Sequence, residues 1–103
     1  MEAITMAKYV SKPNYIDAVL FEAGMHDGYA CYDNISGEFI GFYSKDRYPK
    51  VMKREYAIKV VDEGDVEWQI VKEGKHAIVT YKSGYRTSMS LQYLDLFYER
   101  VED

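Results

Sequence analysis

Residues 54–89 read REYAIKVVDEGDVEWQIVKEGKHAIVTYKSGYRTSM, and this stretch decides the fold class. It holds four short runs in which apolar and polar residues alternate, as in half-buried strands. The expected strands are 54–61, 66–71, 76–81 and 85–89. Short segments rich in Gly and charge separate them, so turn signals recur about every ten residues. This spacing is typical of an antiparallel barrel or sandwich.

The residues before this stretch extend the same pattern. Alternation over 14–21 predicts a strand. Residues 29–32 and 38–43 flank the turn-forming sequence Asp33-Asn34-Ile35-Ser36-Gly37, which predicts a hairpin. The polar segment 44–53 contains Pro49 and is expected to be a loop.

After the stretch, Ser90 can cap a short helical turn, because Leu91, Leu94 and Tyr98 follow at helical spacing. A strand from 96 to 101 is the alternative, and we expect the helical turn followed by a strand. The fold class is therefore mainly β, with a β-rich α+β fold as the variant: a small antiparallel barrel or sandwich with one short C-terminal helical turn. Residues 1–7 are expected to be a flexible lead and 8–103 a single domain.

Composition narrows the functional classes. The 103 residues suit one domain, and 48% of them are hydrophobic, enough for a core. The formal net charge of −4 argues against a nucleic-acid partner, which usually selects a basic chain. With Cys31 as the single cysteine, no internal disulfide is possible, which favours a reducing compartment. No apolar run reaches the ~18 residues of a membrane span and no signal peptide is evident, so we expect a cytoplasmic protein without membrane contact.

Catalytic signatures are weak. His26, beside Asp27, and His76 are each more simply explained as surface turn residues than as general bases. Cys31 lies in an expected strand, where a buried small apolar residue is the simpler reading. The acidic turn around 62–67 lacks the pattern of a calcium loop, and no zinc spacing is present. We therefore expect no enzyme, no metal and no cofactor.

Tyrosine is unusually abundant, with eleven residues. Most of these rings are expected to be half-buried in sheets, with the hydroxyl reaching water. Tyrosine also serves well in protein contacts. The rings expected to be exposed and to contact a partner protein are Tyr29, Tyr32, Tyr43 and Tyr48.

Basic residues interleave with tyrosines in the segment after the hairpin. This pattern can hold phosphates while rings stack on bases. The candidate phosphate-binding or nucleotide-binding residues are Lys45, Arg47, Lys50 and Arg54. A plain solvated loop is the simpler reading, because Asp46 and Glu55 dilute the positive charge. Acidic residues are spread along the chain, and a sheet would have to gather them into one acidic face.

Two end segments resemble small, poorly characterised proteins of tailed bacteriophages. The opening carries Lys8-Tyr9, then Lys12-Pro13, then Ala18 and Phe21 in an apolar strand. The closing segment carries Ile78-Val79-Thr80, then Gly84, then Tyr98-Glu99 and Val101. Residues 24–73 do not follow the family, and Gly74 is followed by Lys75-His76 where the family has Gly-Asp-Tyr. The resemblance implies a small β fold and a phage setting, and it supplies no catalytic residues.

This setting suggests a phage or prophage accessory protein that inhibits a host defence protein by binding it in the host cytoplasm. The first alternative is a sponge that sequesters a nucleotide signal, and the second is a virion or assembly protein. Because small β domains with exposed edges often pair edge to edge, a homo-oligomer is also expected. These expectations rest on analogy with other small phage domains.

Overall fold

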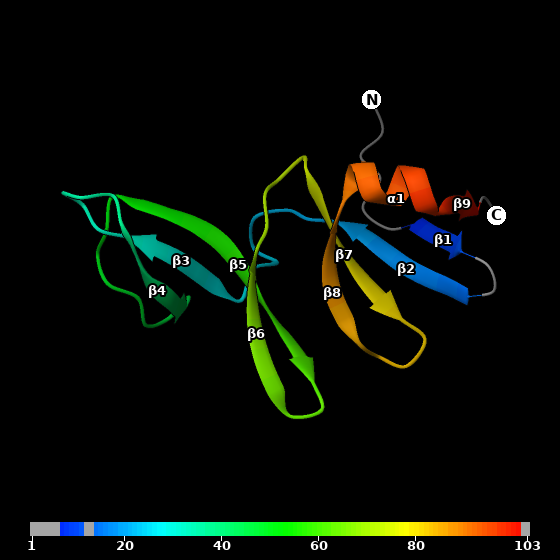
Figure 1. Ribbon diagram of the computed structural model, residues 1–103, viewed down its shortest axis with the longest axis horizontal. Coiled ribbons are helices and arrows are strands. Elements are labelled where there is room, and N and C mark those ends of the chain that lie inside the picture. The colour runs from blue at the N-terminus through cyan, green and yellow to red at the C-terminus, as the bar shows by residue number, and fades with distance from the viewer. Residues whose placement is uncertain (1–6, 12–13, 102–103) are drawn as a thin grey trace.

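The computed structural model describes residues 7–11 and 14–101. They form nine strands and one helix in a mainly β architecture of two antiparallel sheets (Figure 1). The strands are β1 (Ala7–Ser11), β2 (Asn14–Leu20), β3 (Gly28–Tyr32), β4 (Phe39–Ser44), β5 (Lys53–Asp62), β6 (Asp65–Ile70), β7 (His76–Tyr81), β8 (Arg86–Ser90) and β9 (Glu99–Val101). The helix is α1 (Leu91–Phe97).

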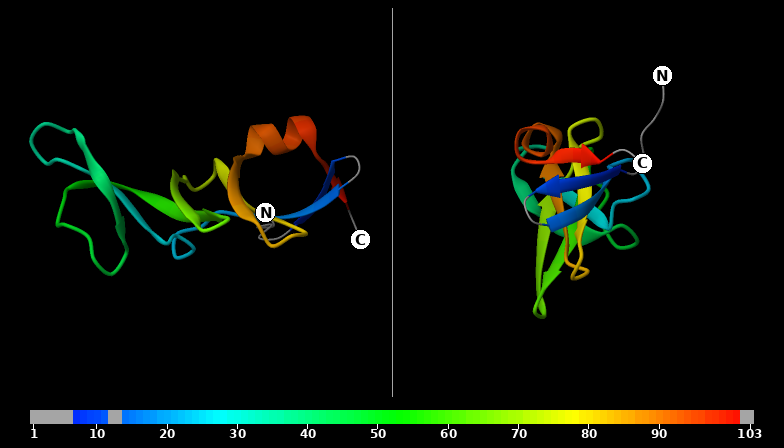
Figure 2. Two further views of the ribbon diagram at one scale, coloured as in Figure 1. Left: turned by 60° about the horizontal axis from the view of Figure 1, so that its bottom comes forward. Right: turned by 90° about the vertical axis from the view of Figure 1, so that its right-hand side faces the viewer.

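The five-stranded sheet has the order β8-β7-β2-β1-β9 and curves into a half-barrel (Figure 2). Helix α1 lies across its open side and contributes Leu94, the one buried residue of the helix. Leu94 packs on alternating residues of β2 and β7, namely Ile16, Ala18, Ala77 and Val79. The side-chain oxygen of Ser90 accepts a hydrogen bond from the Tyr93 amide at 3.1 Å and so begins the helix.

The four-stranded sheet has the order β4-β3-β5-β6. Its β5–β6 hairpin turns at Glu63 and Gly64, whose φ values of 49° and 88° fit the two-residue turn that matches strand twist. The β3–β4 hairpin turns through Asp33, whose Oδ1 accepts hydrogen bonds from the Ile35 and Ser36 amides, each at 2.8 Å. A register irregularity lies between Cys31 and Tyr32, opposite the start of β4.

The two sheets meet along one seam. A second core fills it, formed by Phe21, Ile58, Val60, Val71 and Ile78. Beside this core, Gln69 of β6 accepts hydrogen bonds from the Ser88 amide and hydroxyl and from the Thr87 hydroxyl of β8. Asp27 accepts hydrogen bonds from the Arg86 guanidinium at 2.6 Å and the Lys59 amide at 2.7 Å, so both sheets share one carboxylate.

Joining the sheets by one seam gives an extended molecule, with extents of 48 × 38 × 22 Å. The radius of gyration is 15.3 Å, whereas a compact chain of this length has about 13 Å. The outer half of the four-stranded sheet, with β3, β4 and the start of β5, projects away from the half-barrel (Figure 1).

The expected fold class is confirmed, with the sheets more open than a closed barrel or a full sandwich. The hairpin of 29–43 and the strands of 54–89 are present within one or two residues of the expected bounds, and the Ser90 cap is followed by a helix and then a strand, as expected. The expected lead, 1–7, includes Ala7, which is the first residue of β1 in the structure. The rest of that expected lead lies outside the described residues.

Candidate functional site

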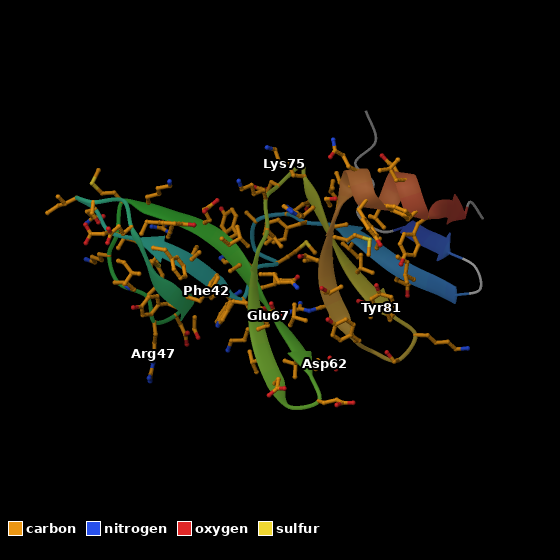
Figure 3. All side chains as sticks on the ribbon, in the orientation of Figure 1. Phe42, Arg47, Asp62, Glu67, Lys75 and Tyr81 are labelled. Carbon is orange, nitrogen blue, oxygen red and sulfur yellow. The ribbon has the colours of Figure 1, made fainter. Side chains whose placement is uncertain are left out.

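One face of the four-stranded sheet carries a row of aromatic rings, here called the aromatic face: Tyr32, Phe39, Phe42 and Trp68. Strand register places them together, because Tyr32 pairs with Phe39 and Phe42 pairs with Ala30, two residues from Tyr32. Ring centroids are 5.8 Å apart for Tyr32–Phe39, 5.1 Å for Phe39–Phe42 and 5.8 Å for Phe42–Trp68. The rings thus run from β4 to β6 (Phe42 is labelled in Figure 3).

Small residues let these rings meet across two intervening strands. Gly28 and Ala30 of β3 and Ala57 of β5 share the face and are buried. Trp68 and Phe42 therefore reach over them from opposite edges and stack with an interplanar angle of 3°. A Cβ at Gly28 would lie 2.7 Å from the Trp68 ring and 2.0 Å from the Tyr43 carbonyl oxygen, so the arrangement requires glycine there.

Two lysines flank the aromatic face. The Lys53 ammonium lies 4.9 Å from the Tyr32 ring centroid, and the Lys59 ammonium lies 5.2 Å from that of Trp68. Between them, Glu55 accepts a hydrogen bond from the Tyr32 hydroxyl. That bond is the main reason the pKa of Tyr32 rises to about 12, with desolvation adding to it. The tyrosine therefore stays neutral and fixed in place.

No layer of the described residues covers this face. Phe39 is 51% exposed, and the row continues beyond Trp68 into the cross-strand pair Val61 and Val66, which are 54% and 56% exposed. The residues of β5 that pack against the half-barrel, Ile58 and Val60, belong to the opposite face. Exposed apolar and aromatic residues in one continuous row mark an interaction surface.

The opposite face carries a second group of rings, the tyrosine cluster: His26, Tyr29, Tyr48 and Tyr56. Ring centroids are 4.6 Å apart for His26–Tyr56 and for Tyr29–Tyr48. The Arg54 guanidinium lies 5.0 Å from the Tyr29 ring and 5.2 Å from the Tyr48 ring. These groups pack against one another, so the cluster fixes the loop before β5 onto the sheet.

His26 is part of this packing. Its Nδ1 accepts a hydrogen bond from the Gly24 amide at 3.1 Å, and its Nε2 lies 3.2 Å from the Tyr29 hydroxyl. Desolvation lowers the pKa of His26, and nearby Lys45 lowers it further. His76 similarly accepts the Lys72 amide at 3.0 Å, and desolvation lowers its pKa. Both histidines are half-buried acceptors, so the expectation of surface turn residues is only partly right.

The four tyrosines chosen from the sequence are divided between the two faces. All four are half-buried and none is exposed, which differs from the exposed contact rings expected from the sequence. Tyr29 and Tyr43 share one face by register, and Tyr48 packs on Tyr29. Tyr32 alone lies on the aromatic face. Phe39, Phe42 and Trp68 were missed. Alternation in 66–70 and small residues at 28, 30 and 57 carry part of the signal, but Phe39 and Phe42, three residues apart, share a face only because of the register irregularity in β4.

The four candidate phosphate-binding residues are also divided. Lys45, Arg47 and Lys50 are exposed on the loop between β4 and β5, and Arg47 extends away from the sheet (Figure 3). Only Arg54 lines a cavity, of about 530 Å³, beside the start of β5. The other residues lining it are Tyr29, Met52, Glu55, Tyr56, Val71, Lys72 and Glu73.

Charges in this cavity are balanced. Arg54 stacks on tyrosines, and Lys72 lies 3.6 Å from a Glu55 oxygen. Glu73 accepts the Ala23 amide at 3.1 Å. With two carboxylates beside two engaged cations, the cavity offers little positive potential for a phosphate.

The remaining candidates are structural. Cys31 is fully buried and free, and desolvation raises the pKa of its thiol, as expected for an inert core residue. Acidic residues occupy separate places, with Asp33 and Glu38 near the β3–β4 turn and Asp62 at the β5–β6 turn, which lie far apart (Figure 1). Across 7–11 and 14–101, no three His, Cys, Asp or Glu side chains gather as metal ligands would.

Compared with protein-family models, with curated proteins and with solved structures, the chain matches none. Within the part of the chain that the structure describes, no helix is long and apolar enough to cross a membrane. The candidate site is therefore the aromatic face, identified from its own geometry.

Proposed function

We propose that this chain is a non-catalytic binding protein that occludes a surface of a partner protein with its aromatic face. The observation that carries the proposal is the uncovered row from Tyr32 through Trp68. Aromatic residues dominate the energetics of protein interfaces, and flat clusters of them serve as anchors. The small residues beneath and the Tyr32–Glu55 bond hold the rings in place, so little side-chain freedom is lost on binding.

Local chemistry favours a protein over a nucleic acid. Beyond Trp68 the face continues as Val61 and Val66, which suit an apolar protein surface and offer nothing to a phosphate backbone. The adjoining turn holds Asp62, Glu63 and Asp65 and would repel phosphates. Lys53 and Lys59 at the rim suit a partner with carboxylates around an apolar patch.

The setting is the finer part of the proposal. Resemblance of the two end segments to tailed-phage proteins supports a phage or prophage accessory protein, whose partner is a host defence component in the host cytoplasm. A role in virion assembly would use the same face on a different partner. The nucleotide-sponge alternative is less well supported, because its four cations are dispersed and the cavity beside Arg54 is charge-balanced.

The test compares three immobilised proteins for capture from lysate of a bacterial host: the wild type, Phe39→Glu and Ile35→Glu. Phe39 is at the exposed end of the aromatic face. Ile35 is 99% exposed in the β3–β4 turn, outside the face, so Ile35→Glu controls for the same apolar-to-acidic change. Circular dichroism verifies that both variants keep the fold.

We expect one protein to be retained by the wild type and by Ile35→Glu, and its retention to fall at least about tenfold with Phe39→Glu, because a charge replaces an aromatic contact residue. Equal retention by all three would contradict the site. Retention of an oligonucleotide or a nucleotide, with no protein, would contradict the partner class.

A further inference from the structure

The four edge strands of the two sheets differ in whether they carry charged residues, and β4 is the exception. Three edge strands carry ionisable residues: β6 has Asp65 and Glu67, β8 has Arg86, and β9 has Glu99 and Arg100. Natural proteins use such charges to prevent edge-to-edge pairing. Strand β4, with the sequence Phe-Ile-Gly-Phe-Tyr-Ser, has no charged residue and no proline. Its edge is therefore the one without this protection.

The hydrogen bonds of β4 show which groups are free for a partner. The Lys45 amide donates a hydrogen bond to the Asp27 carbonyl at 3.2 Å. This bond shows which residues of β4 direct their backbone N–H and C=O groups toward β3 and which direct them toward the open edge. By that alternation Tyr43 points its backbone groups toward Tyr29 of β3, and Phe42 and Ser44 point theirs away. The register irregularity lies near Phe39, so Gly41–Ser44 remains a regular edge.

We propose that two copies of this chain pair antiparallel through β4 and join their four-stranded sheets across a two-fold axis at Tyr43. With Tyr43 opposite its own copy, Phe42 of each strand faces Ser44 of the other. All the outward groups of the regular edge are then used in N–H···O=C bonds. Alignment on Phe42 would instead place Ser44 opposite Ile40, where the register is irregular.

A second copy fits this edge better than a charged peptide would. An uncharged strand meets its own copy without repulsion, although each chain carries a net charge of −4. The exposed area also fits association: the chain exposes 7475 Å², against about 6,000 Å² for a compact monomer of its mass. This excess is larger than the ~800 Å² that one partner buries in a standard interface. The pairing would leave the two aromatic faces on the same side of one continuous sheet.

The test uses charge reversal at the axis, read by sedimentation equilibrium. Wild-type protein is expected at twice the chain mass of 12.0 kDa. Tyr43→Lys and Tyr43→Glu each place like charges directly opposite and are expected to weaken the dimer about tenfold or more. An equimolar mixture of the two variants is expected to recover the dimer, because unlike charges then meet. Leu96→Lys, which adds the same charge to an exposed apolar site on α1, outside both proposed surfaces, is the control and stays dimeric.

Recovery in the mixture separates a lost interface from a lost fold. A monomeric wild type at micromolar concentration would overturn the proposal. So would a dimer unaffected by either Tyr43 variant, or variants that remain monomeric when mixed. Because Tyr43 lies on the opposite side of the sheet from the aromatic face, dimer formation and partner capture fail independently.

Discussion

Gly28 is the single residue on which the aromatic face depends most. Its missing side chain leaves the space that the Trp68 ring and the Tyr43 carbonyl occupy. Gly28→Ala would force those groups apart, and we expect it to lower the free energy of unfolding by about 2 kcal/mol or more, as overpacking does. Urea denaturation followed by circular dichroism measures the change.

Gly41→Ala provides the matched comparison, since its Cβ would meet only the Tyr43 ring at 3.5 Å, an ordinary contact. We expect that variant to unfold within ~1 kcal/mol of the wild type. If both variants lose a similar amount of unfolding free energy, the replacement of a sheet glycine in itself, and not the packing against Trp68, accounts for the loss.

The two histidines give the fold a pH dependence. Desolvation lowers the pKa of both below the usual 6.5, so each binds protons more readily in the unfolded chain. The stability from their neutral forms is fully present above pH 6.5 and falls as the pH drops toward the lowered values. Thermal unfolding between pH 7.5 and 5 should therefore show a falling midpoint.

In the double variant His26→Gln and His76→Gln, that slope should largely disappear, because glutamine keeps an acceptor without titrating. Asp33 titrates in a separate range: amide hydrogen bonds from Ser36 and Ile35 lower its pKa below 3.8, so its contribution is lost only in stronger acid. If the unfolding midpoint of the double variant still falls as steeply between pH 7.5 and 5, groups other than the two histidines cause the pH dependence.

At the level of elements, the contact between β6 and β8 depends on one side chain. Gln69 accepts three hydrogen bonds, from the Thr87 hydroxyl at 3.1 Å and from the Ser88 amide and hydroxyl at 3.0 and 2.6 Å. Gln69→Leu removes the acceptor and should cost about 1–3 kcal/mol in unfolding free energy, because the donors lose their partner in a half-buried place.

Glu67→Leu is the control for that change, since Glu67 lies on the same face of β6 and is exposed. We expect it to alter stability by no more than ~0.5 kcal/mol. Chemical denaturation measures the unfolding free energy of both variants. Equal losses of unfolding free energy would contradict a role for the Gln69 hydrogen bonds in joining the sheets.

The strands that sequence predicts well have their own turn chemistry. Asp33–Gly37 and Asp62–Asp65 define hairpins because their residues favour specific turns, and Ser90 marks the helix because its side chain caps it. Strand β1 was missed because its structure depends in part on pairing with β9, which lies at the other end of the sequence. The alternation of apolar and polar residues within a strand does not show which distant strand it pairs with.

The candidate site is harder to read from sequence because it depends on register. The sequence analysis selected tyrosines because they are abundant. In the folded sheet, however, Tyr32 lies on the opposite face from Tyr29 and Tyr43, beside Phe39 and Phe42 of β4 and Trp68 of β6. A shift of one residue would move every side chain to the other face. Alternation within a strand is visible in sequence, whereas the alignment between strands is fixed by the folded sheet.

For the molecule as a whole, the single seam between the sheets accounts for its proposed behaviour. The half-barrel and its helix form one core, and the seam forms another. The outer half of the four-stranded sheet projects beyond both, with an uncovered aromatic face and an uncharged edge (Figure 1). A chain that buried these features against its own half-barrel would be more compact and would lack a surface for partners.

Trp68 allows the central proposal to be tested directly, because it is the single tryptophan of the chain and lies in the aromatic face. Incorporation of 5-fluorotryptophan gives one fluorine resonance, which the unlabelled captured partner does not obscure. We predict that adding the partner shifts or broadens this resonance, and that the Phe39→Glu variant shows no such change. A partner that binds fully while the Trp68 resonance stays unperturbed would contradict binding through the aromatic face.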